Sequence, residues 1–150
     1  MYGKQEASLM RKEFWTSLGL YMRPLLGAEG EPVNWLNYKT GVKHIYFRMD
    51  ADNKKASIGI ELRQVDESVR KDYFARLVQM RGMLEEEAGE GWVWEEDRLD
   101  EDGRVFSRIG ISIDGVNIFN KADWPAMISF LKPRMLALDN FWWQVKDILL

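Results

Sequence analysis

The sequence predicts an α+β domain in which helices pack on an antiparallel sheet of about five strands. Three observations predict this fold class. Residues 43–64 and 92–113 each contain two alternating apolar and polar runs joined by a turn, which is typical of β-hairpins. Residues 33–41 read as a further strand that leads into the first hairpin. Three other segments repeat apolar side chains every three or four residues, as amphipathic helices do. The expected order along the chain is α-β-β-β-α-β-β-α.

The composition is that of one globular domain spanning residues 1–150. Its 46% hydrophobic and 30% charged residues lie far from the composition of disordered chains. The absence of cysteine excludes disulfides and thiolate chemistry, and it is compatible with a reducing cytoplasm. No stretch has the apolar length of a signal-peptide core or a membrane span, so we expect a cytoplasmic protein with no membrane partner.

The first half of the chain is expected to form one helix and three consecutive antiparallel strands. Ser8 can cap a helix over residues 8–22, which Pro24 should end. The strand at 33–41 turns into the 43–64 hairpin. That hairpin has one apolar face and one polar face. Its apolar side chains are Ile45, Phe47, Met49, Ile58, Ile60 and Leu62.

The second half repeats the helix, hairpin and helix pattern. Asp66 or Ser68 caps a single second helix, which frays at the acids 85–87. The second hairpin pairs residues 92–99 with 104–113. Asp123 should then cap a last helix that reaches about residue 148. Within it, Pro133 removes a backbone hydrogen bond, which predicts a kink or a break.

Charge is distributed unevenly along the chain. Residues 85–103 hold ten acids and one Arg, so the rest of the chain, with 14 acids and 20 bases, has a net charge of +6 against −3 overall. This basic excess is spread over most of the chain, more thinly than is usual in nucleic-acid-binding proteins. Nucleic acid therefore stays open as a partner, but the charge alone does not indicate it.

The seven Trp residues are interpreted mainly as core residues. Trp142 and Trp143 are adjacent on the predicted last helix and point about 100° apart, so one narrow apolar stripe cannot bury both. We expect one of them, Trp143, to contact a protein partner or a second copy of the chain, as in a homodimer.

The polar face of the 43–64 hairpin is where side chains with binding chemistry come together. His44, Tyr46 and Arg48 point to this face, and Glu61 and Arg63 join them from the return strand. We name His44, Tyr46 and Arg48 as candidate binding residues, together with Trp143 outside the hairpin.

Known metal and nucleophile patterns are incomplete in this sequence. Asp50, Asp52 and Glu61 fall at the first, third and twelfth positions of a calcium loop, but Lys54 and Lys55 stand where an oxygen ligand and a glycine are needed. His44 is the only histidine, so a zinc site of the usual kind lacks ligands. Nucleophile elbows and phosphate-cradling glycine loops are missing too. We expect no metal site and no cofactor.

One catalytic hypothesis stays open on the same face. Nucleases of the PD-(D/E)XK class place an Asp near one strand end and a Glu-x-Lys on the next strand, in an α-β-β-β-α-β order, and use Mg²⁺. Here Asp50 or Asp52 precedes the pair Glu61 and Arg63, which makes these four the candidate catalytic residues. Arg replaces the Lys, and a guanidinium stays protonated at working pH. The hypothesis is therefore a nuclease-like, degenerate enzyme that would need Mg²⁺.

Four segments resemble a bacterial family described as domain of unknown function 4268. They read RKEFW near the start, then VNWLNYKTG, IGIEL and ADWP at the opening of the last helix, and the resemblance covers about residues 6–148. Most of these residues pack or cap, so the resemblance implies the fold more strongly than a site, and it carries over no catalytic residues. Members of the family often follow a restriction-endonuclease-like domain, which implies an accessory role near nucleic-acid or defence systems.

These observations together predict a non-catalytic binding or assembly module in the bacterial cytoplasm. The alternative is the PD-(D/E)XK-like nuclease. The two hypotheses differ in whether Glu61 binds a metal ion or only neighbouring side chains.

Overall fold

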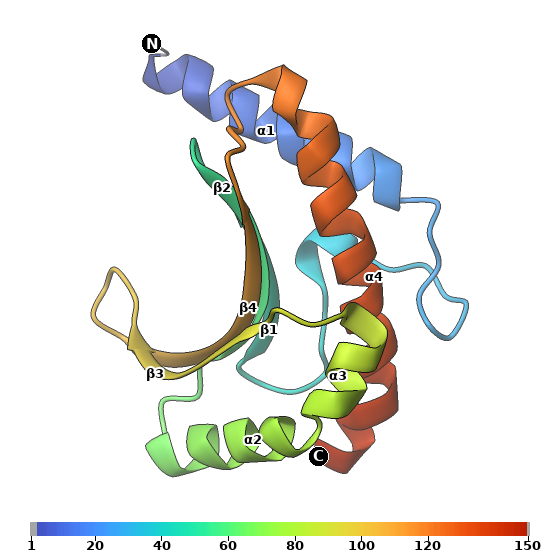
Figure 1. Cartoon of the computed structure of the whole chain (residues 1–150), viewed down its shortest axis with the longest axis vertical. Coiled ribbons are helices and arrows are strands. Elements are labelled where there is room, and N and C mark those ends of the chain that lie inside the picture. The colour runs from blue at the N-terminus through green and yellow to red at the C-terminus, as the bar shows by residue number, and fades with distance from the viewer. Residues whose placement is uncertain (1–2, 150) are drawn as a thin grey trace.

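The fold is a curved antiparallel sheet with helices along its convex side (Figure 1). A computed structural model describes residues 3–149 of the chain. The sheet contains β1 (Ile45–Ala51), β2 (Lys55–Leu62), β3 (Val93–Leu99) and β4 (Val105–Asp114), in the spatial order β1-β2-β4-β3. The predicted α+β class with an antiparallel sheet is confirmed. The expectation of about five strands is wrong, because the sheet has four strands within the described residues.

The missing strand is the predicted one at residues 33–41. This segment forms a short 3-10 helix, η1 (Trp35–Asn37), instead. The side chain of Asn34 accepts a hydrogen bond from the Asn37 N–H and so stabilises a tight turn. The Trp35 Nε1–H donates to the Leu25 carbonyl at 3.0 Å. This side-chain hydrogen bond fixes the position of the segment, which forms no β-ladder with the sheet. As a result β1 is an edge strand, and the order along the chain is α-β-β-α-α-β-β-α.

Strand β2 lies between β1 and β4 and carries the centre of the core. Ile58 and Ile60 are fully buried on its convex face, as the alternating pattern predicts. Both predicted hairpins form, and their turns lie where the sequence places them. The second hairpin has an irregularity between Glu95 and Arg98, where Asp97 adopts a left-handed φ of 56°. Such a bulge increases the local twist of a sheet.

Helices α1 (Lys4–Met22) and α4 (Trp124–Leu149) cover the convex face of the sheet (Figure 1). Helix α1 ends at Met22 as expected, but it begins at Lys4, so Ser8 does not cap it. A kink or a break was predicted at Pro133, and helix α4 runs through it without a break. Pro133 lies on the exposed side of α4, so its ring stays out of the core that holds both halves of the helix.

The predicted second helix is divided into α2 (Glu67–Gln79) and α3 (Arg81–Ala88). Met80 separates them with a φ of −98° and a ψ of 11°, outside the helical region. The Asp66 side chain accepts from the N–H groups of Ser68 and Val69, which confirms it as the cap of α2. The Asp123 cap is not formed. Asp123 belongs to a second 3-10 helix, η2 (Lys121–Asp123), and its carboxylate accepts from the Asn117 N–H.

The buried core lies between the convex face of the sheet and the helices. Trp142 is 1% exposed and Phe141 fully buried on α4, while the adjacent Trp143 is 45% exposed. The expectation that only one of the two Trp side chains fits the core is therefore confirmed. None of the helices within residues 3–149 combines the length and apolar character that crossing a bilayer requires.

Candidate functional site

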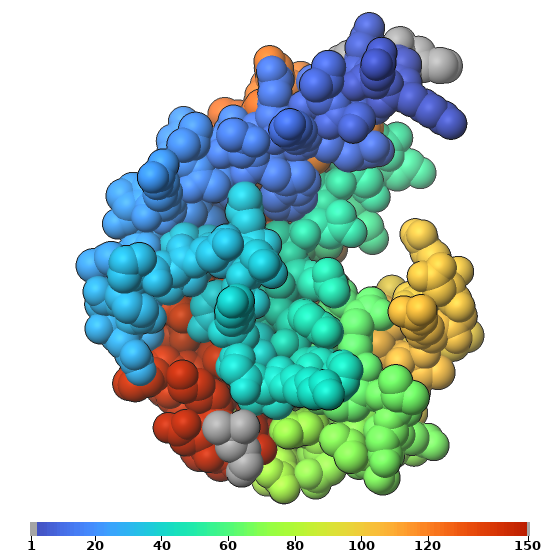
Figure 2. All heavy atoms as spheres, turned by 180° about the vertical axis from the view of Figure 1, so that it is seen from behind, coloured from blue at the N-terminus to red at the C-terminus, as the bar shows by residue number. Residues whose placement is uncertain are grey.

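The concave face of the sheet is not covered by any helix of the described chain (Figure 1). It forms a hollow with a volume of about 690 Å³ between the two hairpins. Figure 2 shows this hollow as a notch in the outline of the molecule, between the β1–β2 hairpin and the tip of the β3–β4 hairpin. Because a notch in the outline has nothing in front of it or behind it, the hollow is a trough open at both ends.

The strand register places the polar residues of the trough in rows across the sheet. One row contains Tyr46, Glu61, Arg108 and Glu95, each beside the next. The neighbouring row contains Arg48, Gly59, Gly110 and Val93, and the row after it contains Asp50, Ser57 and Ser112. A pair of glycines on the two central strands therefore lies between a charged row and a row with two hydroxyls.

Glu61 holds two of the arginines of the trough. Its carboxylate oxygen Oε1 lies 2.7 Å from Nε of Arg63 and 3.0 Å from Nε of Arg48. Arg63 also donates from Nη1 to Oδ2 of Asp100 at 2.9 Å, which ties β2 to the tip of the second hairpin. Glu61 is only 8% exposed, so these contacts form in a site with restricted access to water.

The pKa values of this ion-pair chain follow from its contacts. Burial acts to lower the pKa of Arg63, but hydrogen bonds to Glu61 and Asp100 outweigh it and raise that pKa above the ordinary value. The pKa of Asp100 is lowered, first by the Arg104 backbone N–H and then by Arg63. Both groups are charged at neutral pH, so the chain of ion pairs is fully formed there.

Phe106 contacts two guanidinium groups near the tip of the second hairpin. The guanidinium of Arg63 lies 4.1 Å from the centre of the Phe106 ring, and that of Arg98 lies 5.4 Å from it. Arg98 also pairs with Glu95 at 2.9 Å. Phe106 is only 5% exposed, so the guanidinium groups next to its ring, and not the ring itself, face the trough.

Arg108 differs from the other arginines of the trough. It forms no salt bridge within residues 3–149, although the charges of Glu61, Glu95 and Asp50 act on its guanidinium. Burial lowers the pKa of its guanidinium, since the charged form loses water. Its guanidinium lies over Gly110, where an added Cβ would be 2.3 Å from Cζ, and over Gly59, where an added Cβ would be 3.1 Å from Cζ. Only glycine leaves room for this position.

The candidate catalytic residues lie in two different places. Glu61, Arg63 and Asp50 line the trough. Asp52 lies outside it in the β1–β2 turn, where its carboxylate accepts from the N–H groups of Lys54 and Lys55. Asp50 pairs with Ser57 and is four residues along the strand from the partner of Glu61, roughly 13 Å between Cα positions. In the described part of the chain, no three potential ligands among His, Asp and Glu are grouped to hold a metal ion.

The candidate binding residues are also divided. Arg48 lines the trough, and its guanidinium lies 4.9 Å from the ring centre of Tyr46, which borders a smaller neighbouring hollow. His44 precedes β1 with a left-handed φ of 69° and does not line the trough. Trp143 lies on α4, on the other side of the sheet, in a separate hollow with Asp139 and Lys146.

Arg98, Phe106, Arg108 and the glycine pair belong to the trough but were not predicted from the sequence as site residues. The alternation of β4 already placed Phe106, Arg108, Gly110 and Ser112 on one face. What was missing was the pairing of β2 with β4, which aligns that face with the polar face of the first hairpin. The available signal was that each strand has a charged residue two positions from a glycine, Glu61 and Gly59 in β2 and Arg108 and Gly110 in β4.

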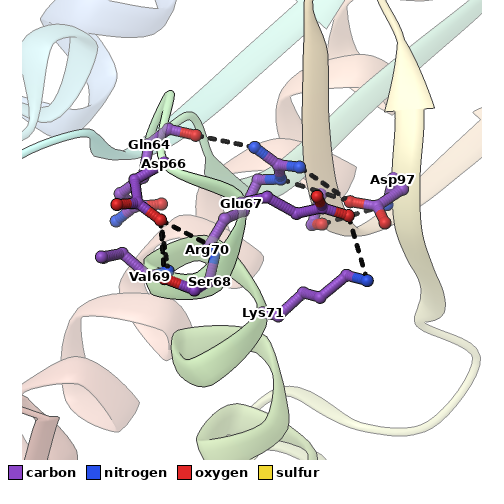
Figure 3. Close-up of polar contacts among 9 residues, drawn as sticks. Gln64, Asp66, Glu67, Ser68, Val69, Arg70, Lys71 and Asp97 are labelled. Carbon is purple, nitrogen blue, oxygen red and sulfur yellow. Dashed lines mark hydrogen bonds and ion pairs between the residues drawn. The ribbon is translucent and has the colours of Figure 1, made fainter.

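The bulge of the second hairpin is held from the helix side by Arg70 (Figure 3). This side chain is 4% exposed and points from α2 between the strands. It donates from Nη1 to the Gln64 carbonyl at 2.8 Å and from Nη2 to Oδ1 of Asp97 at 3.1 Å. The Asp97 N–H donates to Oγ of Ser107 at 3.1 Å, so the bulge is held from both sides.

No curated protein and no solved structure shows a significant match to this chain. A family model does match, over residues 10–146, and its description is Domain of unknown function (DUF4268). Because this match covers nearly the whole chain, including both hairpins of the trough, the chain belongs to the DUF4268 family.

Proposed function

We propose that this chain is a non-catalytic binding module whose concave sheet face holds a single strand of nucleic acid. Its role would be accessory to nucleic-acid or defence systems in the bacterial cytoplasm. The observation that carries the proposal is the uncovered arginine cluster: the guanidiniums of Arg48, Arg63, Arg98 and Arg108 line one trough.

The chemistry of the cluster suits phosphates and bases. A guanidinium presents a planar fork of donors to phosphate oxygens, and its flat face stacks on bases. Arg63 and Arg98 are already oriented by the Phe106 ring, so their planes are held without a ligand. Ordering these long side chains in advance reduces the entropy lost on binding.

The shape of the trough favours an extended single strand. It is open at both ends (Figure 2) and crosses four strands, a path of about 14 Å at the usual spacing between strands. Asp100, Glu101 and Asp102 lie at the tip of the second hairpin and repel phosphates. They direct a polyanion to the floor of the trough and to the β1 edge, where Arg48 lies.

The state of Glu61 supports binding without catalysis. Two guanidiniums share its Oε1 atom, at 2.7 and 3.0 Å. To hold Mg²⁺, Glu61 would have to use its other oxygen beside two guanidinium charges, and Asp50 would have to extend toward it from four residues away. We therefore assign to Glu61 the role of positioning the arginines.

Fluorescence anisotropy with a labelled oligonucleotide tests this function. We expect single-stranded DNA or RNA to bind more tightly than the duplex, with an affinity that falls as salt rises, by a slope of about −0.7 per phosphate contact. Arg48→Ala should weaken binding, because one guanidinium of the trough is lost. The fold should be kept, because Arg63 still pairs with Glu61. Arg23→Ala removes the same charge at the end of α1 and serves as the matched control. Absence of binding at low salt, or equal affinities of the two variants, would overturn the proposal.

The nuclease stays as the alternative because Glu61, Arg63 and Asp50 share the open face. It predicts cleavage of DNA or RNA in Mg²⁺ or Mn²⁺ that Glu61→Ala abolishes. Binding without cleavage, in all substrate forms and with either metal, would exclude it.

Self-association is a separate proposal that concerns Trp143. This side chain is 45% exposed on α4, away from the trough, so a protein partner or a second copy could contact it while the trough is occupied. Sedimentation should show an oligomer that Trp143→Ala dissociates. A monomer for both proteins would refute self-association and leave the binding function untouched.

A further inference from the structure

We infer that Arg108, lying on the glycine pair Gly59 and Gly110, is the seat for one phosphate group in the trough. The hydroxyls of Ser57 and Ser112 would complete that seat. This inference rests on the proposed function, since it names the group of the ligand that the trough recognises. It also makes Arg108 distinct from the other arginines, whose charges are already matched.

The charge of the Arg108 guanidinium is the first feature that supports this inference. Arg48 and Arg63 pair with Glu61, and Arg98 pairs with Glu95. Arg108 has no such ion pair within the described chain, although it lies beside Glu61 in the register. A guanidinium is protonated at all working pH values, and the nearby carboxylates of Glu61, Glu95 and Asp50 favour this charge without forming a salt bridge with it. An anion that enters the trough would form one.

The room that Gly59 and Gly110 leave for the Arg108 guanidinium is the second supporting feature. A Cβ on Gly110 would lie 2.0 Å from Nη1 of Arg108 and 2.8 Å from Nη2. A Cβ on Gly59 would lie 3.0 Å from Nε. The guanidinium therefore rests on backbone, where any larger residue would lift it. Glycine in the interior of a strand costs stability and often marks the close approach of a ligand.

The hydroxyl groups of Ser57 and Ser112 near the guanidinium are the third supporting feature. Arg108 extends over Gly110, which brings its head one row closer to Ser112. Ser57 pairs with Ser112 in the following row, roughly 7 Å away along the strands. A phosphate group fits in such a gap, since it can accept from the guanidinium on one side and from both hydroxyls on the other. Each of the three donor side chains lines the trough.

Binding of a single-stranded oligonucleotide to three variants tests the seat. Arg108→Ala should lose about 10- to 100-fold in affinity, as expected for the loss of hydrogen bonds to a charged group. The dependence of log affinity on log salt should also become shallower by about 0.7, because one phosphate is no longer neutralised. Arg108→Lys should keep the salt dependence but not the full affinity, since an ammonium lacks the planar fork. Arg23→Ala should change neither quantity.

A second measurement separates this inference from the proposed function. Inorganic pyrophosphate is titrated into the wild-type protein while the arginine Nε–H signals are followed by NMR. A saturable shift of the Arg108 signal that Arg108→Ala removes supports the seat, even if oligonucleotides do not bind. Wild-type affinity and salt dependence in Arg108→Ala overturn it, and so does a titration in which only other arginines shift. Retained tryptophan fluorescence and far-UV circular dichroism show that the variants are folded.

Discussion

The substitution Gly110→Ala tests whether the position of Arg108 matters, with no change to any charged residue. An ideal Cβ at this position lies 2.0, 2.3 and 2.8 Å from three atoms, all of them in the Arg108 guanidinium. Ordinary contacts are about 3.5 Å or longer, so the guanidinium must move by roughly 1.5 Å. It is the end of a flexible side chain, and it makes no hydrogen bond within the described chain that this movement would break.

We therefore expect binding and stability to respond differently to Gly110→Ala. Ala is favoured over Gly in a strand by roughly 0.5–1 kcal/mol, so the free energy of unfolding should stay within about 1 kcal/mol of wild type. The affinity for a single-stranded oligonucleotide should fall about as far as in Arg108→Ala, since the donors leave their positions. Urea unfolding followed by tryptophan fluorescence gives the first quantity, and anisotropy gives the second.

Gly82→Ala is the matched control, because a Cβ there meets nothing within 4 Å. It should stabilise α3 by up to about 1 kcal/mol and leave binding unchanged. Wild-type affinity in Gly110→Ala would refute the claim that Arg108 must rest on the glycine pair. A loss of stability far above 1 kcal/mol would refute the claim that Arg108 yields freely.

Three further predictions concern the fold. Trp142→Ala should lower the free energy of unfolding by about 3–5 kcal/mol and Trp143→Ala by at most about 0.5, and equal losses in urea would contradict the burial argument. Burial and a hydrogen bond to Asp139 raise the pKa of Tyr38 above 10.0, so the stability that its neutral phenol provides should be lost as the pH rises above 10. In Tyr38→Phe urea unfolding should show less of this loss, and an unchanged pH dependence would refute it. Hydrogen bonds from Ser68 and Val69 lower the pKa of Asp66, so the free energy of unfolding of the wild type should decrease as the pH is lowered below 3.8. The decrease should be smaller in Asp66→Asn, and identical acid unfolding curves for the two proteins would speak against this.

The hairpins were predictable because their patterns are local. Alternation over residues 43–64 and 92–113 fits no helix, and it assigned the faces of Glu61, Arg63 and Arg108 correctly. The segment 33–41 has the same apolar spacing as a strand. Its outcome depends on the hydrogen bond from the Asn37 N–H to the Asn34 side chain and on the bond from Trp35 to the Leu25 carbonyl ten residues earlier, neither of which the apolar spacing reveals.

The arginine cluster was only half predictable. Arg48 and Arg63 belong to a hairpin whose pairing can be read from the sequence. Arg98 and Arg108 reach the same trough only because β4 pairs with β2 across some fifty residues, and this long-range pairing has no local signal. Helix α4 shows the opposite case. Pro133 was a strong local signal for a break, and it was overridden by a continuous apolar face that packs on the sheet.

The Arg70 contacts at the bulge have a consequence for how a ligand enters. Since Asp97 is held by Arg70 from α2 and by Ser107 from β4, the contacts with α2 help to set the orientation of the second hairpin. The opening between the two hairpins is then fixed during folding, and its conformational entropy is not lost again on association. The proposed binding function then implies that the width of the trough, as well as its charge, selects an extended single strand over a thicker duplex.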